Sequence, residues 1–223
     1  MKTAKVVGWI KAHPPHPPFG LVDACCALYP PYVVNYQLTT IVYQLSDMKL
    51  IILDRDGVIN YDSDQFIKSP EEWRPLPGSL EAIAQLNQAG YRVVVATNQS
   101  GIGRGLFDMP TLNAIHDKMH KACALVGARI DAVFFCPHTA DSHCHCRKPK
   151  AGMLEEIAER YNVNLAGVPT VGDSLRDLQS AATMGALPYL VLTGKGMKTQ
   201  AAGGYPEGTQ VFANLAVLVA ELV

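Results

Sequence analysis

The stretch Met48-Lys49-Leu50-Ile51-Ile52-Leu53-Asp54-Arg55-Asp56 decides the fold that the sequence predicts. Its first six residues are mostly apolar and branched, as is typical of a strand buried inside a parallel sheet. Further strands are expected over residues 91–96, 131–135, 168–171 and 187–192. Apolar residues at helical spacing occupy residues 80–87, 112–126, 154–161, 175–182 and 215–222. Strands that alternate with helices indicate right-handed βαβ crossovers and an α/β fold with a mostly parallel sheet.

The segment before this strand has a different composition. Residues 1–47 hold five charged side chains and six of the 15 prolines, including the run Pro14-Pro15-His16-Pro17-Pro18. The prolines interrupt the apolar stretch that a signal peptide needs, and Pro-rich segments resist packing. We therefore divide the chain into an N-terminal extension, 1–47, that is either poorly ordered or the product of a start codon assigned too far upstream, and a domain, 48–223. A metal site of His13, His16, Cys25 and Cys26 is the less favoured reading of the extension.

The composition of the 223 residues excludes several classes of protein. Lys and Arg total 19, Asp and Glu total 20, and the formal net charge is −1. This balance argues against an electrostatic binder of nucleic acid or membrane surfaces. No apolar run approaches the ~18 residues of a membrane span. We expect a monomer that acts on a small molecule, without nucleic-acid or membrane partners.

Polar residues follow three of the predicted strands. Asp54 and Asp56 follow the first, Thr97 and Asn98 the second, and Asp173 the fourth. Ligands of such sheets bind beyond the carboxyl ends of the strands, so these residues are expected to converge on one rim. Paired carboxylates suit phosphoryl transfer, in which one attacks phosphorus and the other moves protons. Several carboxylates beside a phosphate also call for Mg²⁺.

A second cluster precedes Lys148. The C-x-H positions Cys136 and His138 and the C-x-C positions Cys144 and Cys146 supply three thiolates and one imidazole, the donor set of a closed tetrahedral zinc site. The expected zinc ligands are Cys136, His138, Cys144 and Cys146, with His143 and His145 as alternatives. Such a zinc has no open position for catalytic water, so its expected work is to hold the loop and to aim Arg147 and Lys148. The free thiols fit a reducing cytoplasm.

Four short motifs carry a resemblance to a known family. Asp54-Arg55-Asp56-Gly57-Val58 resembles the first motif of haloacid-dehalogenase (HAD) superfamily phosphatases, Thr97 the second, Lys148 the third and Gly172-Asp173 the fourth. Their order matches over residues 48–223. The resemblance implies a HAD-like Rossmannoid three-layer fold. It lacks a separate cap domain, because the stretch that ends at Gly78 is too short for one.

The resemblance also implies a role for each motif residue. Asp54 would be the nucleophile, Asp56 the acid/base, and Thr97 a hydroxyl donor to the phosphate. Lys148 would neutralise the nucleophile and the phosphoryl oxygens. The implied magnesium ligands are Asp54, the carbonyl of Asp56, and Asp173.

Asp177 lies one helical turn beyond Asp173. It would either orient Lys148 or a metal-bound water, or be a solvated helix residue. Both readings stay open at the level of sequence.

The stretch Thr97-Asn98-Gln99-Ser100-Gly101-Ile102-Gly103-Arg104-Gly105 and the zinc loop narrow the resemblance to the histidinol-phosphate and heptose bisphosphate phosphatases. The pattern TNQSGIxRG is more similar to the D-glycero-D-manno-heptose 1,7-bisphosphate 7-phosphatases. This implies hydrolysis of the 7-phosphate for lipopolysaccharide core synthesis, with Asn98, Arg104 and Arg147 as candidates for holding the sugar or its 1-phosphate. Histidinol phosphate is the alternative substrate. Repair of 3′-phosphate DNA ends and a zinc-dependent binding module are less favoured.

Overall fold

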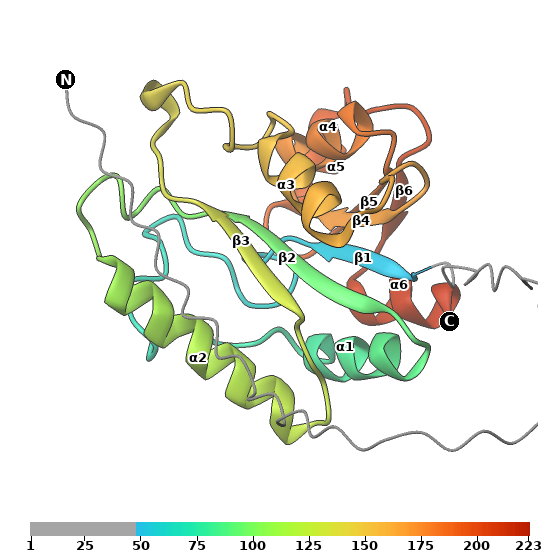
Figure 1. The fold of residues 1–223 in the computed structure, drawn as a ribbon, viewed down its shortest axis with the longest axis horizontal. Helices are drawn as coiled ribbons and strands as arrows, with labels where there is room; N and C mark the ends of the chain where they lie inside the picture. The colour runs from blue at the N-terminus through green and yellow to red at the C-terminus, as the bar shows by residue number, and fades with distance from the viewer. Residues whose placement is uncertain (1–47) are drawn as a thin grey trace, which may run out of the picture. The chain divides into compact units, whose positions relative to one another are not determined.

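The computed structural model describes residues 48–223. The extension 1–47, with its histidines and cysteines, lies outside the described residues. The described part is a three-layer α/β structure around a parallel six-stranded sheet of order β3-β2-β1-β4-β5-β6 (Figure 1). The strands are β1 (Leu50–Leu53), β2 (Arg92–Asn98), β3 (Ala132–Cys136), β4 (Pro169–Gly172), β5 (Leu187–Val191) and β6 (Gln210–Phe212). The predicted fold class is confirmed.

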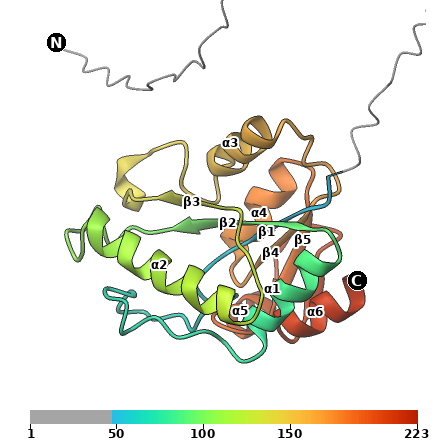
Figure 2. The same cartoon turned by 60° about the horizontal axis from the view of Figure 1, so that its bottom comes forward.

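Helices cover both faces of the sheet, as Figure 2 shows. The helices are α1 (Ser79–Gln88), α2 (Met109–Leu125), α3 (Gly152–Tyr161), α4 (Leu175–Thr183), α5 (Gly196–Ala202) and α6 (Leu215–Leu222), with a short 3-10 turn at Ala140–Ser142. Alternate residues of β1 face opposite layers. Ile51 packs with α1, α2 and α6, whereas Ile52 packs with α3 and α4. A strand buried on both faces explains the unbroken apolar run in the sequence.

Two elements were not predicted from the sequence. Strand β6 has only three residues, and α5 consists of Gly196-Met197-Lys198-Thr199-Gln200-Ala201-Ala202, which offers no apolar stripe at helical spacing. Short edge strands and short polar helices give little periodic signal, because few of their side chains enter the core.

The connection from β1 to α1, residues 54–78, contains no helix and no strand beyond isolated bridges. The buried Trp73 and Ile67 fold this connection back onto the core. The predicted absence of a separate cap domain therefore holds for the described residues. The same connection supplies one wall of the cavity described below.

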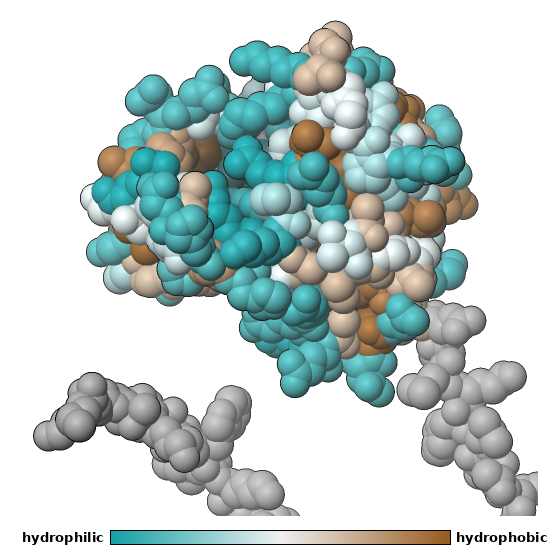
Figure 3. All heavy atoms as spheres, turned by 90° about the horizontal axis from the view of Figure 1, so that it is seen from above, coloured by the Kyte–Doolittle hydropathy of each residue, from teal (hydrophilic) through white to brown (hydrophobic). Residues whose placement is uncertain are grey.

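Hydrophilic side chains predominate on the face seen in Figure 3, with smaller groups of apolar residues among them. Within residues 48–223, no helix combines the length and the apolar character that crossing a bilayer would need.

Candidate active site

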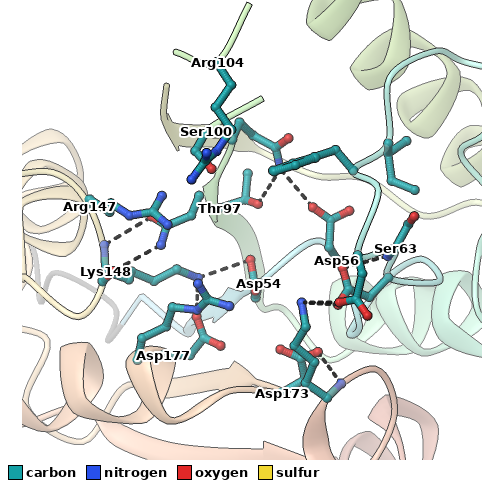
Figure 4. A pocket seen from close by; sticks show the side chains of 18 residues that line it. Asp54, Asp56, Ser63, Thr97, Ser100, Arg104, Arg147, Lys148, Asp173 and Asp177 are labelled. Atoms are coloured by element: carbon teal, nitrogen blue, oxygen red, sulfur yellow. Dashed lines mark hydrogen bonds and ion pairs between the residues drawn. The ribbon is translucent and has the colours of Figure 1, made fainter. Parts of the chain in front are cut away.

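The side chains predicted to converge line one cavity of about 250 Å³ at the carboxyl ends of the central strands (Figure 4). Asp54 directly follows β1, Thr97 lies at the end of β2, and Asp173 directly follows β4. Strand β1 pairs with both neighbours, and Asp54 N donates to Val171 O at 2.9 Å. The sheet thus brings together residues that lie up to 119 positions apart in the chain.

Three carboxylates form a buried cluster in this cavity. Each of Asp54, Asp173 and Asp177 offers one oxygen, and these oxygens lie within 4.8 Å of one another. Burial raises the pKa of Asp54 to about 6, although Lys148 opposes the shift. Burial, with Asp177 and Asp54 nearby, raises the pKa of Asp173 to about 8. Carboxylates held this close repel one another, and their oxygens are the donors that Mg²⁺ prefers, so the cluster fits a hard divalent cation.

The position of Asp173 depends on two glycines. A Cβ atom on Gly57 would lie 2.0 Å from Asp173 Oδ2, and one on Gly194 would lie 2.2 Å from the same oxygen. Both glycines also have positive φ angles, 84° and 57°. The backbone N–H of Lys195 donates to Asp173 Oδ2 at 2.8 Å. The backbone therefore approaches this carboxylate more closely than a residue with a Cβ atom would allow.

Lys148 reaches the cluster from the loop before α3. Its Nζ lies 3.1 Å from Asp54 Oδ1 and 2.5 Å from Asp177 Oδ1, and it donates to Ala96 O at 2.8 Å. Burial opposes its charge, but Asp177 and Asp54 outweigh burial and raise its pKa. Lys148 is therefore a fixed cation beside the predicted nucleophile.

Asn98 lines the cavity, yet its side chain is engaged by the backbone of Lys148. Asn98 Nδ2 donates to Lys148 O at 3.1 Å, and Asn98 Oδ1 accepts from Lys148 N at 3.1 Å. Both polar ends of the amide are thus used. In this geometry Asn98 positions Lys148, and Nδ2 keeps a second N–H beside the cavity that Asn98 lines.

Asp177 is only 3% exposed, so the reading of this residue as a solvated helix side chain is wrong. Besides its ion pair with Lys148, Asp177 Oδ2 accepts from Ser174 N at 3.0 Å and from Ser174 Oγ at 2.5 Å. The bond from Ser174 N is one half of the capping box at the start of α4. Burial raises the pKa of Asp177, but Lys148 and Ser174 outweigh it, and the net shift is downward. The start of the helix thereby holds the carboxylate that orients Lys148.

Asp56 is held by a network that the sequence analysis missed. Arg55 is fully buried and contacts Asp56 through Nη2–Oδ2 at 2.9 Å and Nε–Oδ1 at 3.1 Å. Asn60 Nδ2 donates to Asp56 Oδ1 at 2.8 Å, and Gln99 Nε2 donates to Oδ2 at 2.9 Å. Burial would raise the pKa of Asp56, but Arg55 and these amides outweigh burial and lower it. Gln99 Nε2 also donates to Thr97 Oγ1 at 2.9 Å. Gln99 therefore links Asp56 to Thr97, two of the predicted site residues.

The four predicted zinc ligands lie together. Cys136, His138, Cys144 and Cys146 each offer a donor atom within 4.8 Å of the others. Cys144 Sγ lies 3.6 Å from the sulfur of both Cys136 and Cys146. Sulfurs bound at ~2.3 Å to a tetrahedral zinc lie about 3.8 Å apart, so the donor set fits that ion. Of the alternative ligands, His145 contacts Glu155, and His143 is not part of the cluster.

The rest of the cavity wall carries both positively and negatively charged side chains. Arg147 donates from Nη1 to His138 O at 3.3 Å, which ties it to the zinc loop, and the guanidinium carbon of Arg104 lies 6.0 Å from the Phe66 ring centroid. In Figure 4, Arg104 and Arg147 approach from the side opposite Asp173. The sequence analysis did not single out the other lining residues, which include Asp62, Ser63, Asp64, Arg176 and Lys195.

Comparison with known protein families and solved structures supports the interpretation of this cavity as a phosphatase active site. Residues 49–177 match the polynucleotide kinase 3 phosphatase family, and residues 145–218 match the HAD-hydrolase-like family. A crystal structure of D,D-heptose 1,7-bisphosphate phosphatase from Bordetella bronchiseptica, complexed with magnesium and phosphate, is 64% identical in sequence with a TM-score of 0.78. It covers 78% of this chain and 98% of its own.

Curated relatives give the family directly. The D-glycero-β-D-manno-heptose-1,7-bisphosphate 7-phosphatase of B. bronchiseptica is 64% identical over 79% of this chain and 98% of its own length. The protein of the same name from Pseudomonas putida is 54% identical over 79% of this chain and all of its own length. The chain therefore belongs to the family of the heptose-1,7-bisphosphate 7-phosphatases, within the HAD-like hydrolases.

Proposed function

We propose that this protein hydrolyses the 7-phosphate of D-glycero-β-D-manno-heptose 1,7-bisphosphate to give heptose 1-phosphate and inorganic phosphate. Its place would be the supply of nucleotide-activated heptose for the lipopolysaccharide core. The observation that carries the proposal is the cavity in which Asp54, Thr97, Lys148 and Asp173 meet in a chain 64% identical to a relative of that name.

The proposed reaction proceeds through an aspartyl-phosphate. The Asp54 carboxylate attacks the phosphorus of the 7-phosphate, and the bond from phosphorus to the sugar oxygen breaks. Asp56 gives a proton to that oxygen and later takes one from the water that releases phosphate from Asp54. The contacts with Arg55 and Gln99 fix the place of Asp56, and its charged form suits the second, proton-accepting half.

Two residues would stabilise the transferred phosphoryl group. Lys148 lies beside Asp54 and would neutralise the charge that develops on the phosphoryl oxygens. The Thr97 hydroxyl, held by Gln99, would donate to one of those oxygens.

Magnesium would be held by Asp54, the carbonyl of Asp56, and Asp173, and the third carboxylate of the cluster, Asp177, would hold Lys148. When bound, this ion would neutralise charge on the nucleophile and on the phosphate together. The magnesium and phosphate in the B. bronchiseptica structure support its use here.

We also propose that Cys136, His138, Cys144 and Cys146 bind a structural zinc ion. The zinc would fix the loop from which Arg147 and Lys148 extend, as the bond from Arg147 to His138 O indicates. Arg147, with Arg104, would contact the sugar or its 1-phosphate. Because the cluster needs reduced thiols, we place the protein in the cytoplasm.

For the chain as a whole, we propose that residues 48–223 form the phosphatase domain and act as a monomer, with 1–47 as an extension. The relatives' match over 176 residues supports the first point. Light scattering and steady-state turnover of the purified protein, with and without residues 1–47, would test both. A stable dimer, or loss of turnover on truncation, would contradict them.

A substrate panel tests the proposed function. We expect kcat/KM to be highest for the β-anomer of heptose 1,7-bisphosphate, and lower for its α-anomer, for heptose 7-phosphate, for histidinol phosphate and for a 3′-phosphorylated DNA oligonucleotide. A preference for histidinol phosphate or for the oligonucleotide would overturn the assignment.

A further inference from the structure

Three guanidinium groups line the active-site cavity, those of Arg104, Arg147 and Arg176. They come from separate segments: the loop after β2, the loop before α3, and the first turn of α4. Among residues 48–223, none of the three forms an ion pair with a carboxylate. Arg147 and Arg104 were expected to meet the substrate, but nothing in the sequence motifs pointed to Arg176.

The other cations of the cavity are already neutralised. Lys148 pairs with Asp54 and Asp177, and Lys195 Nζ lies 2.7 Å from Asp62 Oδ2. Because Lys148 is assigned to the reacting phosphate, the positive charge available to a second phosphate resides on the arginines. A substrate with two phosphates needs such charge at the phosphate that does not react.

The side chain of Arg176 is half-buried and fixed at one edge. Its Nε donates to Ser174 Oγ at 3.1 Å, and that hydroxyl donates its own proton to Asp177 Oδ2 at 2.5 Å. The two terminal nitrogens of Arg176 make no hydrogen bond to the protein among the described residues. A planar guanidinium anchored through Nε, with both terminal nitrogens free, is preorganised to bind two phosphate oxygens at once.

We propose that Arg176 binds the phosphate that remains on the sugar and thereby sets the preference for a bisphosphate over a monophosphate. This inference rests on the proposed function. Ser174 links the two ends of the site, because the hydroxyl that holds Arg176 also bonds to Asp177, the partner of Lys148. The fixed orientation of Arg176 would place the unreactive phosphate at a set distance from Asp54 while the other phosphate meets the nucleophile.

The experiment compares two substrates in each protein, heptose 1,7-bisphosphate and heptose 7-phosphate. The readout is the ratio of kcat/KM for the bisphosphate to kcat/KM for the monophosphate. We expect Arg176→Ala to lower this ratio by about 10- to 100-fold, mainly through KM, because two charge-assisted hydrogen bonds are lost. Arg176→Lys keeps the charge without the planar fork, so its ratio should lie between those of the wild type and Arg176→Ala. Arg92→Ala, an exposed arginine at the start of β2, is the matched control and should leave the ratio unchanged.

The outcomes separate this inference from the proposed function. A wild-type protein that does not prefer the bisphosphate contradicts both. A wild-type preference that persists in Arg176→Ala and Arg176→Lys overturns the role of Arg176 alone. Equal losses on both substrates would also overturn it, since a merely structural role lowers both rates and leaves the ratio constant.

Discussion

The carboxylate cluster and the arginines of the same cavity are built in opposite ways. Lys148, Asp173 and Asp177 are each 4% exposed or less. They are held in place by ion pairs and by hydrogen bonds with the backbone. Arg147 and Arg176 are half-buried, and Arg104 is exposed, with no carboxylate partner among the described residues. Charges that stabilise a transition state work best when they are fixed in advance, whereas charges that select a substrate must be free to receive it. The difference is consistent with the proposed roles, chemistry in the first region and substrate selection in the second.

The largest effect is expected at Asp54, the proposed nucleophile. Asp54→Asn keeps the shape of the side chain but removes the attacking charge, so kcat should fall by at least about 1,000-fold. Steady-state rates on heptose 1,7-bisphosphate check the loss, and circular dichroism checks that the fold persists. Near-normal turnover would remove the covalent mechanism and with it the distinction between the two regions.

Lys148→Met tests whether the loss of a buried charge from the carboxylate cluster lowers the stability of the protein. The substitution leaves Asp54 and Asp177 without their cation, and we expect the free energy of unfolding to fall by about 3–5 kcal/mol. Urea denaturation measures the change. Lys68→Met is the matched control, because it breaks the exposed Lys68–Glu72 pair, which is worth about 0–1 kcal/mol. Equal costs in the two variants would contradict the account.

The loop of the proposed zinc site, residues 136–148, joins the two regions, because it presents Arg147 and Lys148 side by side. Cys144→Ala/Cys146→Ala should lose about one zinc per chain, as measured by elemental analysis, and Tm should fall by about 5–10 °C. The control is Cys123→Ala, which removes a buried thiol outside the cluster. Purified wild-type protein without bound metal would refute the structural zinc.

A smaller effect, on the pH dependence of stability, is expected from His116. Its Nε2 lies 3.3 Å from Nη1 of Arg55, the residue that holds Asp56. Burial and the Arg55 charge lower the pKa of His116 to about 4. The unfolded chain, with an ordinary His pKa near 6.5, binds the proton more readily, so stability should fall as pH drops from about 6.5 to about 4.

Replacement of this histidine isolates its contribution. His116→Gln should remove about 1–3 kcal/mol of that pH dependence, measured by denaturant unfolding at several pH values. The control is His120→Gln, an exposed histidine one helical turn away, which should retain it. If the free energy of unfolding of His116→Gln depends on pH as strongly as that of the wild type, this histidine is not held neutral.

The sequence predicted the parts of the molecule that have a local signal. The run from Leu50 to Leu53 reveals a buried strand, and the spacing of Cys136, His138, Cys144 and Cys146 reveals four donors. Because parallel strands end at one rim, the convergence of Asp54 and Asp173 followed as well.

The residues that were missed act through contacts that no local pattern encodes. Gly194 and Lys195 belong to a loop far along the chain from Gly57, and only the packed sheet brings them to Asp173. Arg176, on the first turn of a helix, has the sequence signature of a solvated residue. Gln99 reveals its importance only once Asp56 and Thr97 are seen on either side of it.

The most direct test of the central claim is to trap the phosphoryl-enzyme. Protein mixed with heptose 1,7-bisphosphate, quenched in acid and reduced with borohydride should carry homoserine at position 54, detected by peptide mass spectrometry, because an acyl phosphate is reduced and a free carboxylate is not. Reduction at Asp54 that depends on substrate is the predicted result. Unmodified Asp54 under conditions of rapid turnover, or modification at Asp56 or Asp173 instead, would contradict the account.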